Sequence, residues 1–259
     1  MSAARADLLV LCYHGVSRSW PEPVAVDPEK MRRQVVRLLR HGWRPATFSD
    51  AVLSPRARRT LVVTFDDALR SVFLLALPVL RELGVPATVF APTGFVGSDE
   101  PFAWPGVDHW LGSTHQRELE GMSWDELARL RDEGWEVGSH AVTHPRLTGL
   151  SDERLAAELR DSKETIAARL GACRSIAYPY SDFDARVVTA ARAAGYEAGA
   201  VVLPARHGGD QLSVPRVPML GAESDLAHRL HVSRGMRRLQ ATPSWPRVQR
   251  AARAFSRGR

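Results

Sequence analysis

The segment TLVVTFDD at residues 60–67 decides the predicted fold of this 259-residue chain. Its first six residues are β-branched or apolar, which is typical of a strand buried on both faces, and two acidic residues end it. Residues 71–83 follow with helical spacing up to Gly84, and PATVFA at residues 86–91 is strand-like again. A strand, a helix and a second strand in this order predict a βαβ unit with parallel strands.

The same alternation extends in both directions from this unit. Further strands are expected at residues 7–13, 135–138, 175–177 and 196–201, and further helices at residues 27–41, 124–133, 151–170 and 184–194. Such alternation predicts an α/β fold whose parallel strands close, or nearly close, into one barrel. We expect the barrel domain at residues 1–225 and a basic helix or tail at residues 226–259.

The composition is that of a globular protein, with 44% apolar and 25% charged residues. Cys12 and Cys173 are the only cysteines in the sequence, which excludes a disulfide framework and a cysteine-based zinc cluster. The apolar run at residues 8–13 is shorter than a secretory signal, and the run at residues 72–80 is too short to span a membrane. We therefore expect a soluble, cytoplasmic protein.

Positive charge is concentrated at the C-terminus. The net charge is +6, but residues 226–259 hold nine arginines and no acidic residue, which leaves −3 for residues 1–225. A mildly acidic body does not favour nucleic-acid binding. Residues 243–259 place Trp245, Val248 and Phe255 at helical spacing among arginines. Two interpretations stay open: a peripheral contact with the anionic inner face of a membrane, or a frayed basic terminus.

Three short segments at expected strand ends carry residues suited to catalysis. They are the Asp66-Asp67 pair, the segment GSHAVTHP at residues 138–145 and the segment AYPYS at residues 177–181. Two imidazoles four residues apart can share one cation, and the proline leaves the next backbone N–H free as an oxyanion donor. Taken singly, each segment also fits a structural role: a helix cap, a surface loop and a rigid turn.

In this order the three segments resemble the polysaccharide deacetylase family, the NodB-homology domain of carbohydrate esterase family 4, in its Ala-Tyr-Pro-Tyr subset. The similarity covers residues 8–220 and includes Tyr13-His14, PATVF at 86–90, MSWDEL at 122–127, LGACRSIAYPYSDFD at 170–184 and AAGYEAG at 193–199. The resemblance implies a distorted (β/α)7-type barrel. It also implies metal-dependent hydrolysis of an N-acetyl or O-acetyl group on a carbohydrate or glycan precursor.

The resemblance assigns roles to individual residues. Asp67, His140 and His144 would hold one divalent ion, which we expect to be Zn²⁺, with Co²⁺, Ni²⁺ and Mn²⁺ as alternatives. Asp66 would be the general base, and the backbone N–H of Tyr180 would bind the oxyanion. The chemistry agrees, because two imidazoles and one carboxylate leave an open metal position, as hydrolytic sites require.

In many members of the family, the histidine of a Leu-x-His segment on the last strand is the general acid. This sequence has no clear counterpart of that segment. We expect His207, His228 and His231 to be solvated surface residues. Two candidates for the acid remain: Asp66 after it has taken up a proton, and His14 at the end of the first strand.

Further departures concern the residues around the base. The arginine that begins the third motif in many members is Ala177 here, and we predict that Arg216 in VPRVP, residues 214–218, supplies the cation instead. Glycines of the family pattern are replaced by Ala68 and Ser181, which suggests slightly different turns.

Two alternatives to a metal-dependent deacetylase stay open. One is a metal-free member of a related barrel family that hydrolyses another amide, and the other is a catalytically impaired, glycan-binding protein. The expected partner of the deacetylase is an N-acetylated sugar or glycan, which is free, lipid-linked or polymeric. Neither the particular sugar nor the oligomeric state is predicted.

Overall fold

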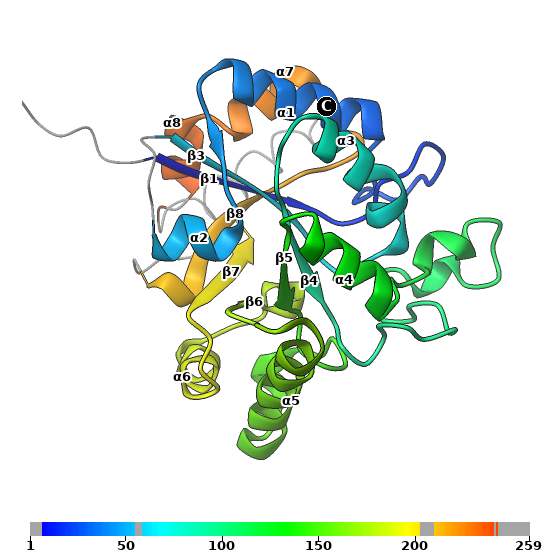
Figure 1. Ribbon diagram of the computed structural model, residues 1–259, viewed down its shortest axis with the longest axis vertical. Coiled ribbons are helices and arrows are strands. Elements are labelled where there is room, and N and C mark those ends of the chain that lie inside the picture. Colours follow the sequence, from blue (N-terminus) through cyan, green and yellow to red (C-terminus); the bar gives the residue numbers. More distant parts are fainter. Residues whose placement is uncertain (1–6, 55–58, 203–209, 241, 243–259) are drawn as a thin grey trace, which may run out of the picture.

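The computed structural model describes residues 7–54, 59–202, 210–240 and 242. Its central feature is a closed barrel of parallel strands (Figure 1). The strands are β1 (Asp7–Tyr13), β3 (Arg59–Phe65), β4 (Thr88–Ala91), β5 (Glu136–Ser139), β6 (Ser175–Ala177), β7 (Ala198–Val202) and β8 (Val214–Pro218). The barrel closes because β1 pairs with both β3 and β8. The predicted (β/α)7-type barrel is therefore confirmed.

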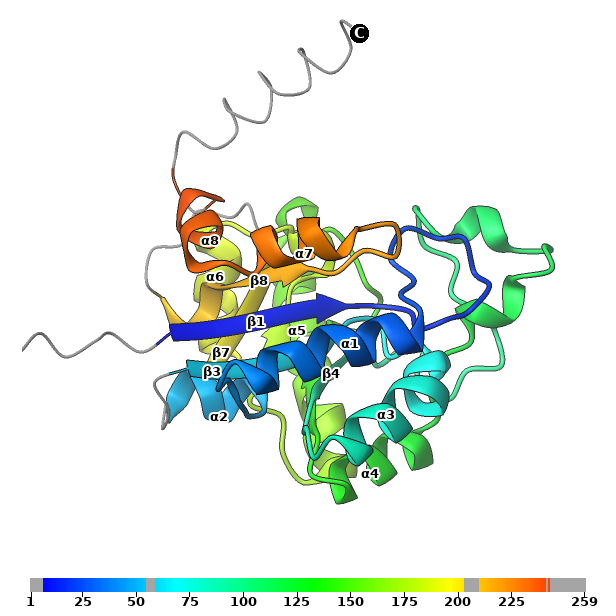
Figure 2. The same ribbon diagram turned by 90° about the horizontal axis from the view of Figure 1, so that it is seen from above.

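A short additional strand, β2 (Arg44–Pro45), pairs with the first residues of β3, and β4 pairs with the last ones. Helix α2 (Phe48–Leu53) follows β2 and contacts β3 and β7, so it covers the amino-terminal end of the barrel (Figure 2). The sequence pattern had not indicated either element.

Alternate residues of each long strand belong to different apolar clusters. Leu61, Val63 and Phe65 of β3 pack in the larger cluster with the surrounding helices. Val62 packs in the smaller cluster, together with Phe48 of α2 and Phe90 of β4. Burial on both faces explains why β3 is apolar throughout instead of alternating.

The remaining helices surround the barrel. They are α1 (Pro28–Arg40), α3 (Leu77–Glu82), α4 (Trp124–Asp132), α5 (Asp152–Leu170), α6 (Ala185–Ala193), α7 (Asp225–His231) and α8 (Arg234–Gln240). Side-chain caps begin several of them at the expected places, including Ser151 for α5 and Asp184 for α6. Helices α1, α4, α5 and α6 begin and end within two residues of the predicted bounds.

The predicted helix at residues 71–83 is interrupted. A π-helical turn at Val72–Ala76 precedes α3. Pro78 stands in the first turn of α3, and proline has no backbone N–H to continue the regular hydrogen-bond pattern. The wider π-type turn accommodates this interruption.

The C-terminal region packs against the barrel as far as it is described. Arg237 of α8 donates hydrogen bonds to the carbonyl of Leu8, at 2.7 Å, and to the carboxylate of Asp7, at 2.9 Å. The prediction that His228 is solvated was wrong, because α7 turns this side chain inward and leaves it 2% exposed. His207 and residues 243–259 lie outside the described residues.

Among the residues that the structure describes, no helix is both long and apolar enough to cross a membrane.

Candidate metal centre and catalytic cleft

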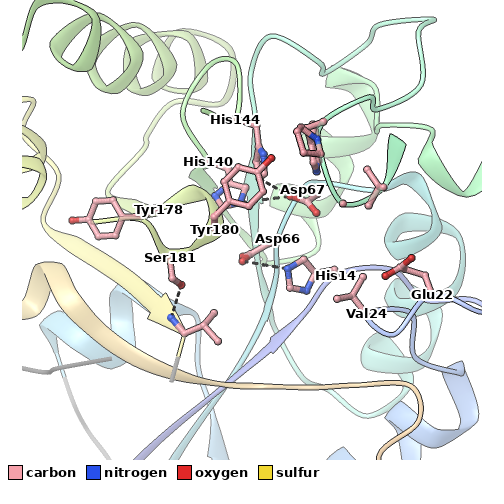
Figure 3. Close-up of a pocket in the computed structure, with 15 residues that line it drawn as sticks. His14, Glu22, Val24, Asp66, Asp67, His140, His144, Tyr178, Tyr180 and Ser181 are labelled. Atoms are coloured by element: carbon pink, nitrogen blue, oxygen red, sulfur yellow. Dashed lines mark hydrogen bonds and ion pairs between the residues drawn. The ribbon is translucent and has the colours of Figure 1, made fainter. Parts of the chain in front are cut away.

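The carboxyl ends of the strands bring the candidate residues together (Figure 3). Asp66 continues the pairing of β3 by donating its N–H to the carbonyl of Tyr13 at 3.0 Å. The backbone then turns into the left-handed region, with φ of 70° at Asp67 and 51° at Ala68. Glycine adopts this conformation without strain, so Ala68 retains the conformation suited to the glycine that it replaces. The turn separates the two acidic side chains.

The two histidines lie in a loop after β5. The backbone N–H of His140 donates to the carbonyl of Ala91, and His144 has a positive φ of 56°. Glu158 of α5 accepts hydrogen bonds from the N–H groups of Val142 and Thr143, at 2.8 and 2.9 Å. The Thr143 hydroxyl also donates to this carboxylate, at 2.6 Å. Glu158 therefore holds the loop, a role that sequence inspection missed because it is one of several glutamates on a helix.

Three ligand atoms face one another in this region. Oδ1 of Asp67 lies 3.5 Å from Nε2 of His140 and 3.4 Å from Nε2 of His144. Two ligands that each lie about 2.1 Å from one tetrahedral ion are about 3.4 Å apart. The three side chains therefore have the spacing that a single divalent ion requires.

The protonation of these groups also suits metal binding. His140 donates from Nδ1 to the carbonyl of Ala177 at 2.6 Å, which leaves the lone pair of Nε2 directed at Asp67. Burial lowers the pKa of His140 to about 4, so this imidazole is neutral near pH 7. Burial alone would raise the pKa of Asp67, but hydrogen bonding and the charge of His144 lower it below its usual value. A neutral imidazole and an ionised carboxylate are the states that bind a metal.

Asp66 has a different environment from its neighbour. Arg216 of β8, which is fully buried, donates two hydrogen bonds to the Asp66 carboxylate at 2.6 and 2.8 Å. Burial would raise the pKa of Asp66, but the charge of Arg216 holds it well below the usual range. Cys12 donates a weak hydrogen bond to the same carboxylate at 3.5 Å, and burial raises the pKa of this thiol. Asp66 is therefore a fixed, ionised carboxylate.

His14 lies in the same cleft but is not hydrogen-bonded to Asp66. Its Nε2 is 3.9 Å from Oδ2 of Asp66, and its buried Nδ1 has no partner among the described residues. The ring can therefore interact with a bound ligand without first breaking a strong contact.

Tyr180 follows β6 in a left-handed conformation, with φ of 57°. Within the described part of the chain, its backbone N–H donates to no acceptor. Its ring lies 4.6 Å from the His144 ring, with the Arg146 guanidinium on it at 4.5 Å. Ser181, the other glycine replacement, has φ of 51° and accepts a hydrogen bond from Val202 at 2.7 Å. Strained backbone of this kind costs about 1 kcal/mol or more per residue and is common at functional sites.

These groups line an open cleft of about 510 Å³. Six of the predicted site residues contribute to its lining: His14, Asp66, Asp67, His140, His144 and Tyr180. Arg216 lies behind Asp66 and does not line the cleft. A cleft of this volume accommodates one or a few sugar units.

The long segment between β4 and α4 forms one wall of the cleft through Trp104, Pro105, Gly106 and Val107. Trp104 stacks on the His144 ring, with centroids 4.1 Å apart, and packs in a separate apolar cluster with Phe102.

The chain is similar in sequence to known proteins. Residues 54–199 match the sequence profile of the polysaccharide deacetylase family. The chain is 24% identical over 212 residues to YxkH of Bacillus subtilis (strain 168), a protein named after the same family, covering 80% of this chain and 68% of YxkH. Asp66, Asp67, His140, His144 and Tyr180 lie inside the profile match.

Solved structures show the same fold. The Streptococcus pyogenes deacetylase PplD in complex with acetate has a TM-score of 0.72 at 20% identity, covering 88% of this chain and 99% of that one. IcaB from Ammonifex degensii has a TM-score of 0.67 at 24% identity, covering 94% and 96% of the two chains.

Proposed function

Because the chain belongs to the polysaccharide deacetylase family, we propose that it removes acetyl groups from a carbohydrate or glycan precursor with one divalent metal ion. The preferred substrate is an N-acetylated sugar, with an O-acetylated one as the alternative. One observation carries the proposal: Oδ1 of Asp67 lies 3.4–3.5 Å from two imidazole nitrogens, in a cleft that also contains the Asp66 carboxylate. Zn²⁺ is the proposed ion because it prefers nitrogen and carboxylate ligands in tetrahedral geometry.

Asp67, His140 and His144 would hold the ion. When bound, it supplies Lewis-acid polarisation of a carbonyl and makes water more acidic. Asp66 acts as the general base that takes a proton from the attacking water. Arg216 keeps this carboxylate ionised and fixes its direction through two hydrogen bonds.

The backbone N–H of Tyr180 stabilises the oxyanion that develops on the acetyl oxygen. This amide makes no hydrogen bond to another described residue, so it needs no rearrangement to do so. Losing one such donor typically costs about 2.7–4 kcal/mol of transition-state stabilisation.

The amine or hydroxyl that leaves the acetyl carbon must receive a proton. Asp66 can return the proton that it took up, and His14 is the second candidate because its Nε2 lies 3.9 Å from Asp66 in the same cleft. An aryl acetate with a good leaving group distinguishes them, since its hydrolysis needs no general acid. A His14→Gln variant that loses activity on an N-acetyl sugar but retains it on the aryl acetate identifies His14 as the acid; equal losses on both assign the step to another group.

The proposed function is tested by measuring acetate release from a panel of N- and O-acetylated sugars. The enzyme is assayed after chelation and again after adding back Zn²⁺, Co²⁺, Ni²⁺ or Mn²⁺. Activity that disappears on chelation and returns with a metal supports the proposal. Full activity in metal-free protein would favour the metal-free amide hydrolase, and glycan binding without acetate release would favour the impaired, glycan-binding alternative.

We also propose that the enzyme works in the cytoplasm, with a peripheral contact between its Arg-rich C-terminus and an anionic membrane surface. The support is the charge pattern of residues 226–259, nine arginines without an acidic residue. Sedimentation with vesicles of phosphatidylglycerol and phosphatidylcholine tests the contact: salt-sensitive binding of the full chain, lost on deletion of residues 243–259, is expected. Equal recovery of both proteins in the supernatant would contradict it.

A further inference from the structure

One charged residue of the cleft has no part in the proposed mechanism. Glu22, from the segment between β1 and α1, lines the same cleft as Asp66 and Asp67. Figure 3 shows it on the far side of His14 and Val24 from Asp66. Its side chain is 13% exposed, so the carboxylate is mostly removed from bulk water.

Two aromatic ring nitrogens lie beside the carboxylate of Glu22. The indole N–H of Trp110 donates to Oε2 of Glu22 at 2.7 Å. Nε2 of His109 is 3.5 Å from the same oxygen, but this imidazole is 56% exposed and carries a charge only when protonated. Among the described residues, no lysine or arginine lies within ion-pair distance of Glu22.

The other two carboxylates of the cleft differ from Glu22 in this respect. Asp66 is paired with Arg216, and Asp67 faces the two imidazoles that would share its metal ion. A carboxylate that is largely buried is expected to have a cationic partner, because its desolvation is otherwise uncompensated. A ligand can provide that partner at Glu22.

The proposed reaction itself generates a suitable cation. Hydrolysis of an N-acetyl group releases acetate and leaves an amine on the sugar, which takes up a proton to become an ammonium group. On a polymer, the next cleavage then takes place beside a cationic sugar. Glu22, separated from the reacting groups by His14 and Val24 within one cleft, is placed to contact a neighbouring unit.

We propose that Glu22 binds the ammonium group of an already deacetylated amino sugar next to the unit being hydrolysed. The enzyme would then prefer partly deacetylated glycans to fully acetylated ones. This inference rests on the proposed deacetylase function and adds a substrate class to it.

The test compares the wild type with Glu22→Gln. Glutamine retains a carbonyl oxygen that can accept the Trp110 hydrogen bond, so the substitution removes charge with little change of shape. Glu82→Gln is the matched control, because Glu82 loses the same charge at an exposed site that does not line the cleft. The substrates are β-1,4- and β-1,6-linked trimers of N-acetylglucosamine, each fully acetylated or with one free amine.

In the wild type, kcat/KM is expected to be higher for the trimer with a free amine, and this preference should weaken with added salt. Glu22→Gln should reduce the preference about tenfold, as loss of a charge-assisted hydrogen bond predicts, and Glu82→Gln should leave it unchanged. If Glu22→Gln lowers kcat/KM equally for the acetylated trimer and for the trimer with a free amine, the proposal is overturned in favour of a contact with a sugar hydroxyl. No change on either trimer would overturn it as well.

A binding measurement separates this inference from the proposed function. Calorimetric titration with a fully deacetylated glucosamine trimer needs no turnover. About tenfold weaker binding to Glu22→Gln than to wild type supports the ammonium site even if no acetylated sugar is hydrolysed. Equal binding to the two proteins rejects the site even if the wild type is an active deacetylase.

Discussion

The two ends of the barrel differ in the partners that surround their buried carboxylates. At the amino-terminal end, Glu136 of β5 accepts hydrogen bonds from the Ser49 amide and from the hydroxyls of Ser49, Thr88 and Ser175. At the carboxyl end, Nε2 of His14 lies 3.9 Å from Asp66 and Nε2 of His144 lies 3.4 Å from Asp67, and Nδ1 of each ring has no partner among the described residues.

The difference separates a structural polar network from a reactive one. Hydrogen bonds that are complete within the protein stabilise the fold and leave nothing for a ligand. Imidazoles whose hydrogen bonds are incomplete within the described residues are retained at a cost in stability, and their Nε2 atoms are available to a metal ion or substrate. Substitutions at the two ends should therefore affect different measurements.

The largest effect is expected from the three candidate ligands. Changing Asp67, His140 or His144 to Ala should remove the metal and with it all measurable acetate release, because two remaining ligands bind a divalent ion weakly. Elemental analysis of the purified variants checks this. Metal content equal to that of the wild type would refute the ligand assignment.

Asp66→Asn should keep the metal and lose turnover by about two to four orders of magnitude, because the amide cannot accept the proton of water. Metal content and kcat are measured on the same preparation. Activity near the wild-type level would show that another group is the base.

Arg216→Met is predicted to shift the pH dependence of activity. The guanidinium lowers the pKa of Asp66, so its removal should raise that pKa and move the acid limb of kcat/KM upward by about 1 pH unit or more. Arg216→Lys, which restores a positive charge, should reverse part of the shift. An unchanged profile in Arg216→Met would exclude a positioning role for the arginine.

The same variant should change how stability depends on pH. Because the folded-state pKa of Asp66 is lowered, its contribution to stability is present above the unfolded-state pKa of about 3.9 and is lost as the pH falls. Denaturant unfolding at pH 7 should show a loss of about 3–5 kcal/mol, because the carboxylate stays buried without its partner. The deficit relative to wild type should shrink toward acidic pH.

Glu158→Gln should have a smaller effect, because it weakens the hydrogen bonds that hold the histidine loop without removing a ligand. We expect metal affinity to fall about tenfold, as for other groups that orient metal ligands. Competition with a chelator measures it. Metal affinity equal to that of wild type would show that the loop holds its shape without this charge.

Glu136→Gln should have the smallest effect on catalysis. Acetate release should stay within about twofold of wild type, while the free energy of unfolding should fall by about 1–3 kcal/mol through the weakened network. Both are measured on one protein sample. A large loss of turnover with normal stability would contradict a purely structural role for the hydrogen-bond network at the amino-terminal end.

Local patterns explain why much of this fold was predictable. The apolar run of β3, the caps of α5 and α6 and the order of strands and helices depend on residues close together in the chain. The interruption at Pro78 was missed because helical spacing continues across it. His228 was misjudged because a short polar helix does not reveal which side will face the barrel.

The sequence by itself determined the alternating architecture, the position of acidic and imidazole side chains after buried strands, and the family to which those segments are similar. The sequence also suggested Arg216 as the cation beside Asp66. Only the tertiary structure decided how the other groups meet: Glu158 holds the histidine loop from a helix, and Glu22 enters the cleft without a lysine or arginine partner among the described residues. The physical reason is that strand and helix preferences act over a few residues. The partner of a buried charge depends on how the closed barrel brings distant strand ends together.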